Sequence, residues 1–269
     1  MTSEETAKHS MEIVLIGAGR LATNLGNALH GRGHHIGWVY SRTAQSAEAL
    51  ATQLGATATD DIHMLPATAD IFIFAVSDAA LPSVATEAAK GRERQLFVHT
   101  AGSMPLDIFQ GLVERYGVMY PMQTFSREKL VDFTEIPVFI EASDDATCQT
   151  VCDLAATVSS SVSILSTEQR RYLHLAAVLA CNFVNHCYDM AATLLERHGM
   201  SFDAMLPLID ETSRKVHTLS PREAQTGPAV RYDTNVIERQ TALLGEWPDS
   251  QRIYEMMSKH IHQYATIEK

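Results

Sequence analysis

A glycine-containing turn between an apolar run and an amphipathic segment constrains this chain most. Glu12–Ile16 is a short apolar run, and Gly17 to Ala22 (Gly-Ala-Gly-Arg-Leu-Ala) follow it and open a segment with leucines at helical spacing. In a strand–turn–helix unit the first glycine permits a tight turn, the second lets backbone approach a pyrophosphate, and a small third residue lets helix and strand pack closely. The alternative is a turn that needs glycine for structural reasons only. The residues predicted to hold phosphates are Gly17, Gly19, Arg20 and Leu21.

Strand-like and helix-like segments alternate through the first part of the chain. Apolar runs lie at 36–40, 70–76, 95–100, 117–120, 137–140 and 162–165, and helical patterns lie at 44–54 and 145–158. The run at 70–76 is continuously apolar, as expected of a strand covered on both faces. Because parallel strands need crossover connections, the alternation predicts an α/β fold. We expect residues 11–166 to form a doubly wound, largely parallel sheet with helices on both faces.

The character of the chain changes after residue 166. Thr167 to His198 has the pattern of one long helix, and its segment 173–195 is apolar nearly all round. Such a helix has to be buried on several sides. No strand signal returns: 201–219 is helical, 221–234 is loop-like, and two more helices begin near Asn235 and Asp249. Residues 167–269 are therefore predicted to form an all-helical domain built on one long buried helix, with a homodimer partner as its cover.

Composition excludes several classes of protein. The chain has 269 residues, enough for two domains, and its net charge of −11 argues against a general nucleic-acid binder. It contains no apolar stretch long enough to span a membrane, no Cys-x-x-Cys pair and no histidine spacing typical of a metal site. Residues 1–10 are predicted to be a disordered leader, and the compartment to be the cytoplasm.

The end of the second strand indicates which dinucleotide fits. A site that prefers NAD places an acid there to accept a hydrogen bond from the ribose 2′-hydroxyl. This chain has Ser41, Arg42 and Thr43 instead, two hydroxyls around a guanidinium, which suit a 2′-phosphate. The sequence therefore predicts NADP(H). The alternative is a solvated Arg42 with Thr43 capping the next helix.

Two later strands also end in polar residues. Residues just beyond the carboxyl ends of parallel strands line the ligand crevice of open α/β sheets. We expect Val76 and Ser77 to border the ribose or nicotinamide, and Asp78 to cap the following helix. His99 could belong to the core or to the site, and we leave both open. The residues expected at the reacting end are Thr100, Gly102 and Ser103.

The long helix supplies candidate catalytic residues. His174, Val178 and Asn182 recur every four residues, a spacing that shares one face of an α-helix. His174 could deliver a proton and Asn182 could orient a substrate atom, although a hydrogen-bonded dimer core would use the same residues. Arg231 and Asp233, in a loop of the helical domain, are candidate substrate contacts or an exposed ion pair.

These motifs together resemble the Rossmann-like oxidoreductases that carry a C-terminal helical domain of unknown function. The resemblance rests on the segments Ile16–Ala22, Val76–Asp78, His99–Ser103, Tyr120–Phe125, His174–Val178 with Asn182, and Gly227–Asp233. More distantly the chain is similar to pyrroline-carboxylate reductases, deazaflavin-dependent NADP oxidoreductases and β-hydroxyacid dehydrogenases. The resemblance implies NADP binding and a helical dimerisation domain, and adds Gln123 to the candidate substrate contacts.

Three positions depart from these patterns. Tyr120 and Gln240 stand where the family pattern has histidine, so the resemblance brings no acid/base role to either position. Val178 stands where β-hydroxyacid dehydrogenases place a lysine, which disfavours their mechanism. The sequence therefore predicts an NADP(H)-dependent oxidoreductase acting on a C=N or C=O bond of a small metabolite, at the cleft between the two domains. A sensor or scaffold that binds NADP(H) without turnover is the alternative.

Overall fold

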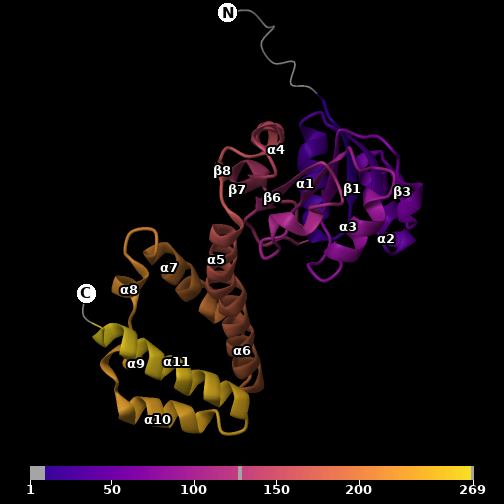
Figure 1. Ribbon diagram of the computed structural model, residues 1–269. Coiled ribbons are helices and arrows are strands. Elements are labelled where there is room, and N and C mark those ends of the chain that lie inside the picture. The colour runs from indigo at the N-terminus through magenta and orange to yellow at the C-terminus, as the bar shows by residue number, and fades with distance from the viewer. Residues whose placement is uncertain (1–9, 127–128, 268–269) are drawn as a thin grey trace, which may run out of the picture. The chain divides into compact units, whose positions relative to one another are not determined.

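The computed structural model describes residues 10–126 and 129–267 (Figure 1). The first part alternates strands and helices, and short 3₁₀ turns connect some of them. The strands are β1 (Glu12–Ile16), β2 (His35–Tyr40), β3 (Thr57–Thr59), β4 (Ile71–Phe74), β5 (Leu96–His99), β6 (Arg115–Pro121), β7 (Val138–Ala142) and β8 (Val162–Ile164). The helices between them are α1 (Arg20–Gly31), α2 (Ala44–Leu54), α3 (Leu81–Ala89) and α4 (Asp145–Val158).

All eight strands form one sheet, in the order β3-β2-β1-β4-β5-β6-β7-β8. Every neighbouring pair is parallel except β6 with β7. The chain winds outward from β1 in one direction and from β4 in the other, so the strand order reverses between these two. This arrangement confirms the predicted doubly wound, largely parallel sheet. Its switch point, between β1 and β4, is where such sheets bind ligands beyond the carboxyl ends of their strands.

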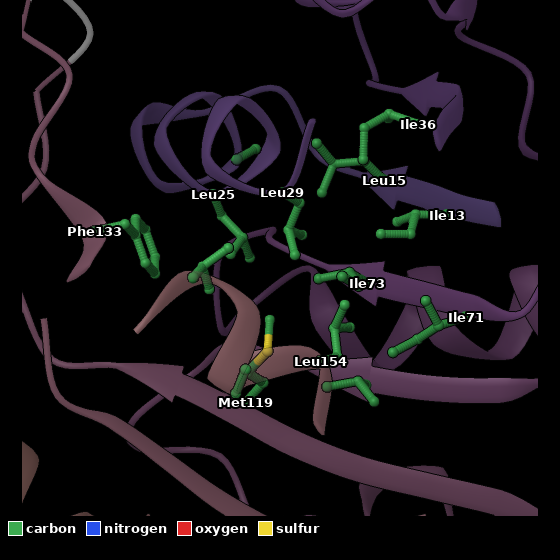
Figure 2. Close-up of a cluster of buried hydrophobic side chains, with 14 of the residues drawn as sticks. Ile13, Leu15, Leu25, Leu29, Ile36, Ile71, Ile73, Met119, Phe133 and Leu154 are labelled. Carbon is green, nitrogen blue, oxygen red and sulfur yellow. The ribbon is translucent and has the colours of Figure 1, made fainter. Parts of the chain in front are cut away.

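The sheet is buried on both faces because its central strands are apolar at nearly every position, with Glu12 and His99 at the ends of β1 and β5 as exceptions. Alternate residues of β1 point to opposite faces, so Ile13 and Leu15 belong to one core cluster and Val14 and Ile16 to the other. Helices α1, α2 and α4 cover the first face, where Leu25 and Leu154 meet the strands (Figure 2). Helix α3 covers the other face. These layers hold the carboxyl ends of β1, β2, β4 and β5 in fixed register.

Local sequence signals set several helix boundaries. Helix α2 ends where Gly55 adopts the left-handed conformation, at φ 67°. Helix α4 begins after Asp144, whose carboxylate accepts a hydrogen bond from the Thr147 N–H. The structure adds one strand that the sequence pattern does not indicate, β3. It has only three residues, on the sheet edge.

The second part of the chain is helical, as predicted. Its elements are α5 (Thr167–Ala177), a π turn (Val178–Asn182), α6 (Phe183–Arg197), α7 (Leu206–Lys215), α8 (Pro221–Ala224), α9 (Pro228–Arg231), α10 (Thr234–Leu243) and α11 (Pro248–Thr266). The predicted long helix is thus two α-helices joined by a π turn, and the predicted loop at 221–234 contains two single-turn helices. No side chain of α6 is buried in the single chain.

By compactness the chain divides into two units, residues 1–181 and 182–269. The predicted boundary, between 166 and 167, coincides with the start of α5 and so lies before this division. That helix belongs to the first unit because Arg170, near its beginning, is buried against β7 and the segment after β5. The predicted leader lies outside the described residues except for Ser10, whose hydroxyl donates a hydrogen bond to the Gly33 carbonyl.

The described helices include none that is long and apolar enough to cross a membrane. Within residues 10–126 and 129–267, no three histidine, cysteine or carboxylate side chains are grouped so that they could hold a metal ion. The four cysteines are unpaired. Cys148 and Cys152 lie one turn apart on α4, where they pack against the core.

Candidate functional site

A cavity of about 340 Å³ opens at the switch point of the sheet. It is built from the segments that follow β1, β2 and β4 and from the first turn of α2. Its lining contains seven of the predicted cofactor contacts and no carboxylate. The lining residues are Gly17, Ala18, Gly19, Tyr40, Ser41, Arg42, Thr43, Ser46, Ala75, Val76, Ser77, Ala80 and Val84.

The turn after β1 requires glycine at position 17. Its φ is 119°, in the region that favours glycine. A Cβ at this position would lie 2.3 Å from the carbonyl oxygen of Ala75, the first residue after β4. The Gly17 N–H also donates to the Tyr40 carbonyl, at 2.8 Å. Gly17 therefore joins the ends of β1, β2 and β4 in one tight junction, which no larger residue could occupy.

Gly19 has a different reason to be glycine. A Cβ added there would meet no protein atom within 4 Å, so the fold itself leaves room for a side chain. Gly19 is the N-cap of α1, and with no side chain it cannot satisfy the free N–H groups of the first turn. Those groups and the positive end of the helix suit a phosphate. Arg20 and Leu21 begin α1 beside them, but their side chains do not line the cavity.

The end of β2 places hydroxyls and a guanidinium in the same cavity. Ser41, Arg42 and Thr43 all line it, and Arg42 is exposed. Thr43 is the N-cap of α2, but its hydroxyl makes no capping hydrogen bond. Ser46, from the first turn of α2, adds a hydroxyl that the sequence analysis missed. Its only signal was its place three residues after the N-cap.

A second cluster lies where β5 and β6 end. The Tyr120 hydroxyl, at the end of β6, lies 3.1 Å from Nδ1 of His174 on α5, within hydrogen-bond distance. The two rings meet nearly edge-on, with centroids 5.9 Å apart. A Cβ at Gly102, in the segment after β5, would come within 2.9 Å of both rings. Three elements of the first unit therefore converge on one phenol–imidazole pair.

Tyr120 brings a proton-donating group to a position at which the family resemblance implied no acid/base role. Its side chain is buried, and burial raises the pKa of the phenol, an effect that the Arg170 guanidinium opposes. The phenol is therefore held in its protonated form. It can donate a hydrogen bond or a proton, which the sequence analysis did not foresee at this position.

His99 belongs to the core. It is fully buried, and burial and the nearby Arg170 lower its pKa to about 3, so the ring is neutral. Its Nδ1 accepts a hydrogen bond from the Ala101 N–H. Nε2 therefore carries the proton and donates it to the Pro105 carbonyl, 3.2 Å away. Both ring nitrogens are occupied in shaping the segment after β5, which decides between the two roles left open.

Thr100 and Ser103 brace the segments that surround the site. The Thr100 hydroxyl donates to the Phe74 carbonyl, which joins the ends of β4 and β5. Ser103 donates to the carboxylate of Asp78, so the segment after β5 is joined to the one after β4. Asp78 was expected to cap α3; the structure contradicts this, since the N-cap is Ala80 and no side chain caps the helix.

A buried ion pair attaches α5 to this region. Arg170, which is 1% exposed, pairs with Glu141 of β7 and donates to the Met104 carbonyl. Glu141 also accepts hydrogen bonds from the N–H and hydroxyl of Thr167. Neither Arg170 nor Glu141 was predicted from the sequence, because charged residues on a helix or near a strand end usually lie in solvent.

The remaining predicted residues lie elsewhere. Asn182 is exposed and belongs to the second unit. It is the last residue of the π turn that follows α5, the helix that carries His174. Gln123 is exposed, and its side-chain oxygen accepts a hydrogen bond from the Thr124 N–H.

The structure also shows the contacts of Asp233, Arg231 and Gln240 in the helical part. The Asp233 carboxylate caps α10 by accepting from the Val236 N–H. Arg231 is exposed, and no ion pair joins it to Asp233 in the described part of the chain. Gln240 accepts a hydrogen bond from the Tyr254 hydroxyl.

Both parts of the chain match families of known proteins. Residues 1–123 match the family described as a Rossmann-like domain, and residues 136–261 match a domain of unknown function, DUF2520. BF3122 of Bacteroides fragilis, provisionally assigned as an NADP oxidoreductase, is 49% identical over 94% of this chain and 98% of its own, with a TM-score of 0.91. The chain belongs to this family of Rossmann-like proteins with a DUF2520 domain. No protein with a curated description matches the sequence.

More distant solved structures share the fold. The protein TM1727 of Thermotoga maritima is 21% identical, with a TM-score of 0.78, over 94% of this chain and 99% of that one. A reductive aminase of Aspergillus terreus, in complex with NADPH and ethyl-5-oxohexanoate, is 17% identical, with a TM-score of 0.69, over 94% and 93%. These likenesses concern architecture alone.

Proposed function

We propose that this protein is an NADP(H)-dependent oxidoreductase that transfers a hydride to or from a C=N or C=O bond of a small metabolite. The observation that carries the proposal is the cavity at the switch point. It combines an uncapped helix N-terminus at Gly19 with Arg42 and the neighbouring hydroxyls of Ser41, Thr43 and Ser46, and its lining holds no carboxylate.

The residues present fit NADP(H). The open space at Gly19 allows backbone to approach a pyrophosphate, and a guanidinium flanked by hydroxyls suits a 2′-phosphate. An acid at the end of β2 would repel that phosphate, and this chain has none there. Val76 and Ser77 would border the ribose or nicotinamide. The bound dinucleotide would supply or accept the hydride.

Oxidoreductase activity with NADP(H) is also supported by a relative. The protein that shares 49% of its residues with this chain is provisionally assigned as an NADP oxidoreductase. Reaction at a cleft between the two domains remains a prediction, as do substrate contacts by Ser103, Gln123, Arg231 and Asp233 and a catalytic role for Asn182.

Oxidation of NADPH by purified protein tests the proposal. Absorbance at the reduced nicotinamide band would be followed with a panel of cyclic imines and 2-oxo acids, each with NADPH and with NADH. We expect at least one compound to be reduced faster with NADPH. Tight NADPH binding without oxidation by any compound would contradict turnover and favour the sensor.

Two further proposals concern the assembled protein. We propose a homodimer through the helical domain, because α6 carries Phe183 and Val184 exposed to solvent and buries no side chain in the single chain. We also propose the cytoplasm as its location, since the four cysteines have no arrangement typical of an oxidising compartment.

A further inference from the structure

We propose that Tyr120 is the group that exchanges a proton with the substrate, and that His174 is its relay to solvent. The proposal rests on the proposed oxidoreductase function and deepens it. In the sequence analysis His174 was the donor and Tyr120 had no role. The geometry reverses their order, because Tyr120 is the buried member of the pair and His174 is only partly buried.

The position of the pair in the sheet supports this assignment. Tyr120 ends β6 and Gly102 follows β5, so both lie at the edge of the sheet that also carries the dinucleotide cavity. The Ser103–Asp78 hydrogen bond connects the segment that holds Gly102 to the segment after β4, which lines that cavity. A proton donor for a hydride acceptor has to lie at this edge.

Gly102 keeps the two rings in contact. An added Cβ would be 2.6 Å from Nδ1 of His174 and 2.9 Å from Cζ of Tyr120. The φ of Gly102 is not positive, so its backbone does not require glycine. The missing side chain therefore makes room for the phenol–imidazole contact alone, which is what a dedicated pair needs.

Arg170 acts as a positioning residue. It lies one turn before His174 on α5, and residues four apart share a helix face. Its pairing with Glu141 and its bond to the Met104 carbonyl fix that face against β7 and the segment after β5. Its Nε is buried without a protein partner among the described residues. The network holds His174 against Tyr120 without occupying either ring's polar atoms.

For reduction, a bound reduced nicotinamide dinucleotide would supply a hydride, two electrons, to the carbon of the C=N or C=O bond. Oη of Tyr120 gives its proton to the nitrogen or oxygen, and the O–H bond of the phenol breaks. Nδ1 of His174 gives a proton to the phenolate, while Nε2 takes one from water. Tyr120 returns to its starting state, and His174 is left as its other neutral tautomer. Exchange with solvent restores the Nδ1 proton, so the net proton comes from solvent.

The charges around Tyr120 suit a neutral donor. Arg170 and His174 face it from α5, and Cys181 faces it from the π turn. Burial outweighs the Arg170 cation and raises the pKa of the phenol. Tyr120 is therefore protonated before each turnover, and the phenolate formed is a strong enough base to take a proton back from His174.

Imidazole NMR tests the pair without any substrate. ¹⁵N-histidine spectra would be recorded across pH for the full-length wild type, Tyr120→Phe and the matched control Tyr116→Phe, which removes a phenol oxygen from the same strand. We expect the His174 Nδ1 resonance to move in Tyr120→Phe only, because that variant removes the hydroxyl that lies 3.1 Å from Nδ1. Superimposable His174 resonances in wild type and Tyr120→Phe would overturn the pair.

Kinetics test the direction of transfer, with the panel compound that wild type reduces fastest. Tyr120→Phe should lower kcat about 100-fold and leave the NADPH Kd within about threefold. Wild-type kcat should fall as pH rises through the raised pKa of Tyr120, because donation needs the phenol proton, and this dependence should vanish in Tyr120→Phe. Gly102→Ala should lower kcat by parting the rings. Tyr116→Phe should behave as wild type.

The two proposals fail differently. Wild-type kcat and an unchanged pH profile in Tyr120→Phe, with NADPH turnover intact, would overturn the role of Tyr120 and leave the oxidoreductase in place. A wild type that binds NADPH but reduces no compound would overturn the oxidoreductase, and proton donation with it. In that case the NMR result still decides whether the two rings form one unit.

Discussion

Single residues divide into those that the fold requires and those that it leaves open for a ligand. Gly17 belongs to the first kind, because a Cβ there would collide with the Ala75 carbonyl. Gly19 belongs to the second kind, since nothing in the protein would touch its Cβ. The same motif thus contains one glycine for folding and one for function, and a single substitution can separate them.

Gly19→Asp should abolish cofactor binding without harming the fold. An aspartate at an N-cap stabilises a helix by up to about 1 kcal/mol, and here it meets no neighbour. Its carboxylate would repel a pyrophosphate at that helix end, so we expect NADPH affinity to fall at least about 100-fold. Calorimetry and thermal unfolding of the same sample measure both effects. A fall in Tm together with intact NADPH binding would contradict this account of Gly19.

His99 should make the protein sensitive to acid. Its pKa is about 3 when folded, against 6.5 for the ordinary side chain. Below pH 6.5 the unfolded chain therefore binds a proton that the folded chain refuses, and stability falls as pH drops towards 3. Between pH 7 and 4.5 we expect this residue to cost about 2–3 kcal/mol. Urea unfolding at both pH values should show a smaller difference for His99→Gln than for wild type.

Secondary structure elements were largely predictable because their signals are local. Helices α2 and α4 have the predicted bounds, 44–54 and 145–158. Strand β3 escaped prediction because three half-exposed edge residues carry no clear alternation. The π turn escaped because its residues have ordinary helical propensity. The Tyr120–His174 contact was out of reach, because it depends on how α5 docks against the sheet.

That docking depends on the buried Arg170–Glu141 pair. Glu141→Gln would leave the guanidinium buried without its counter-charge, and we expect a loss of about 2–3 kcal/mol in unfolding free energy. Glu114→Gln is the matched control, because the Arg94–Glu114 pair is exposed; its effect should stay below about 0.5 kcal/mol. Equal effects of the two substitutions in urea unfolding would show that the buried pair does not hold α5.

At the scale of the whole molecule, the sequence predicts a long buried helix, whereas α6 buries no side chain in the single chain. Its apolar pattern was read correctly, but the side chains of α6 are not covered within the chain. An apolar sequence pattern indicates that a surface has to be buried, but it does not identify the molecule that buries it. We propose that a second copy of this chain buries it in a homodimer.

Phe183→Glu should weaken that dimer. The ring is 57% exposed in the single chain, so a charge there costs the monomer little but opposes burial against a second copy. Sedimentation at micromolar concentration should show a dimer for wild type and a larger monomer fraction for Phe183→Glu. Met64→Glu, at an exposed methionine of the first unit, is the control. A monomeric wild type would contradict the proposal.

We propose that the cavity at the switch point selects the 2′-phosphate of NADP(H). Calorimetric titration of wild type and Arg42→Glu with NADP⁺ and with NAD⁺ tests it most directly. We expect wild type to bind NADP⁺ about 10- to 100-fold more tightly than NAD⁺, and Arg42→Glu to reverse that order. No heat with either dinucleotide at millimolar concentration, or an affinity ratio that Arg42→Glu leaves unchanged, would contradict the claim.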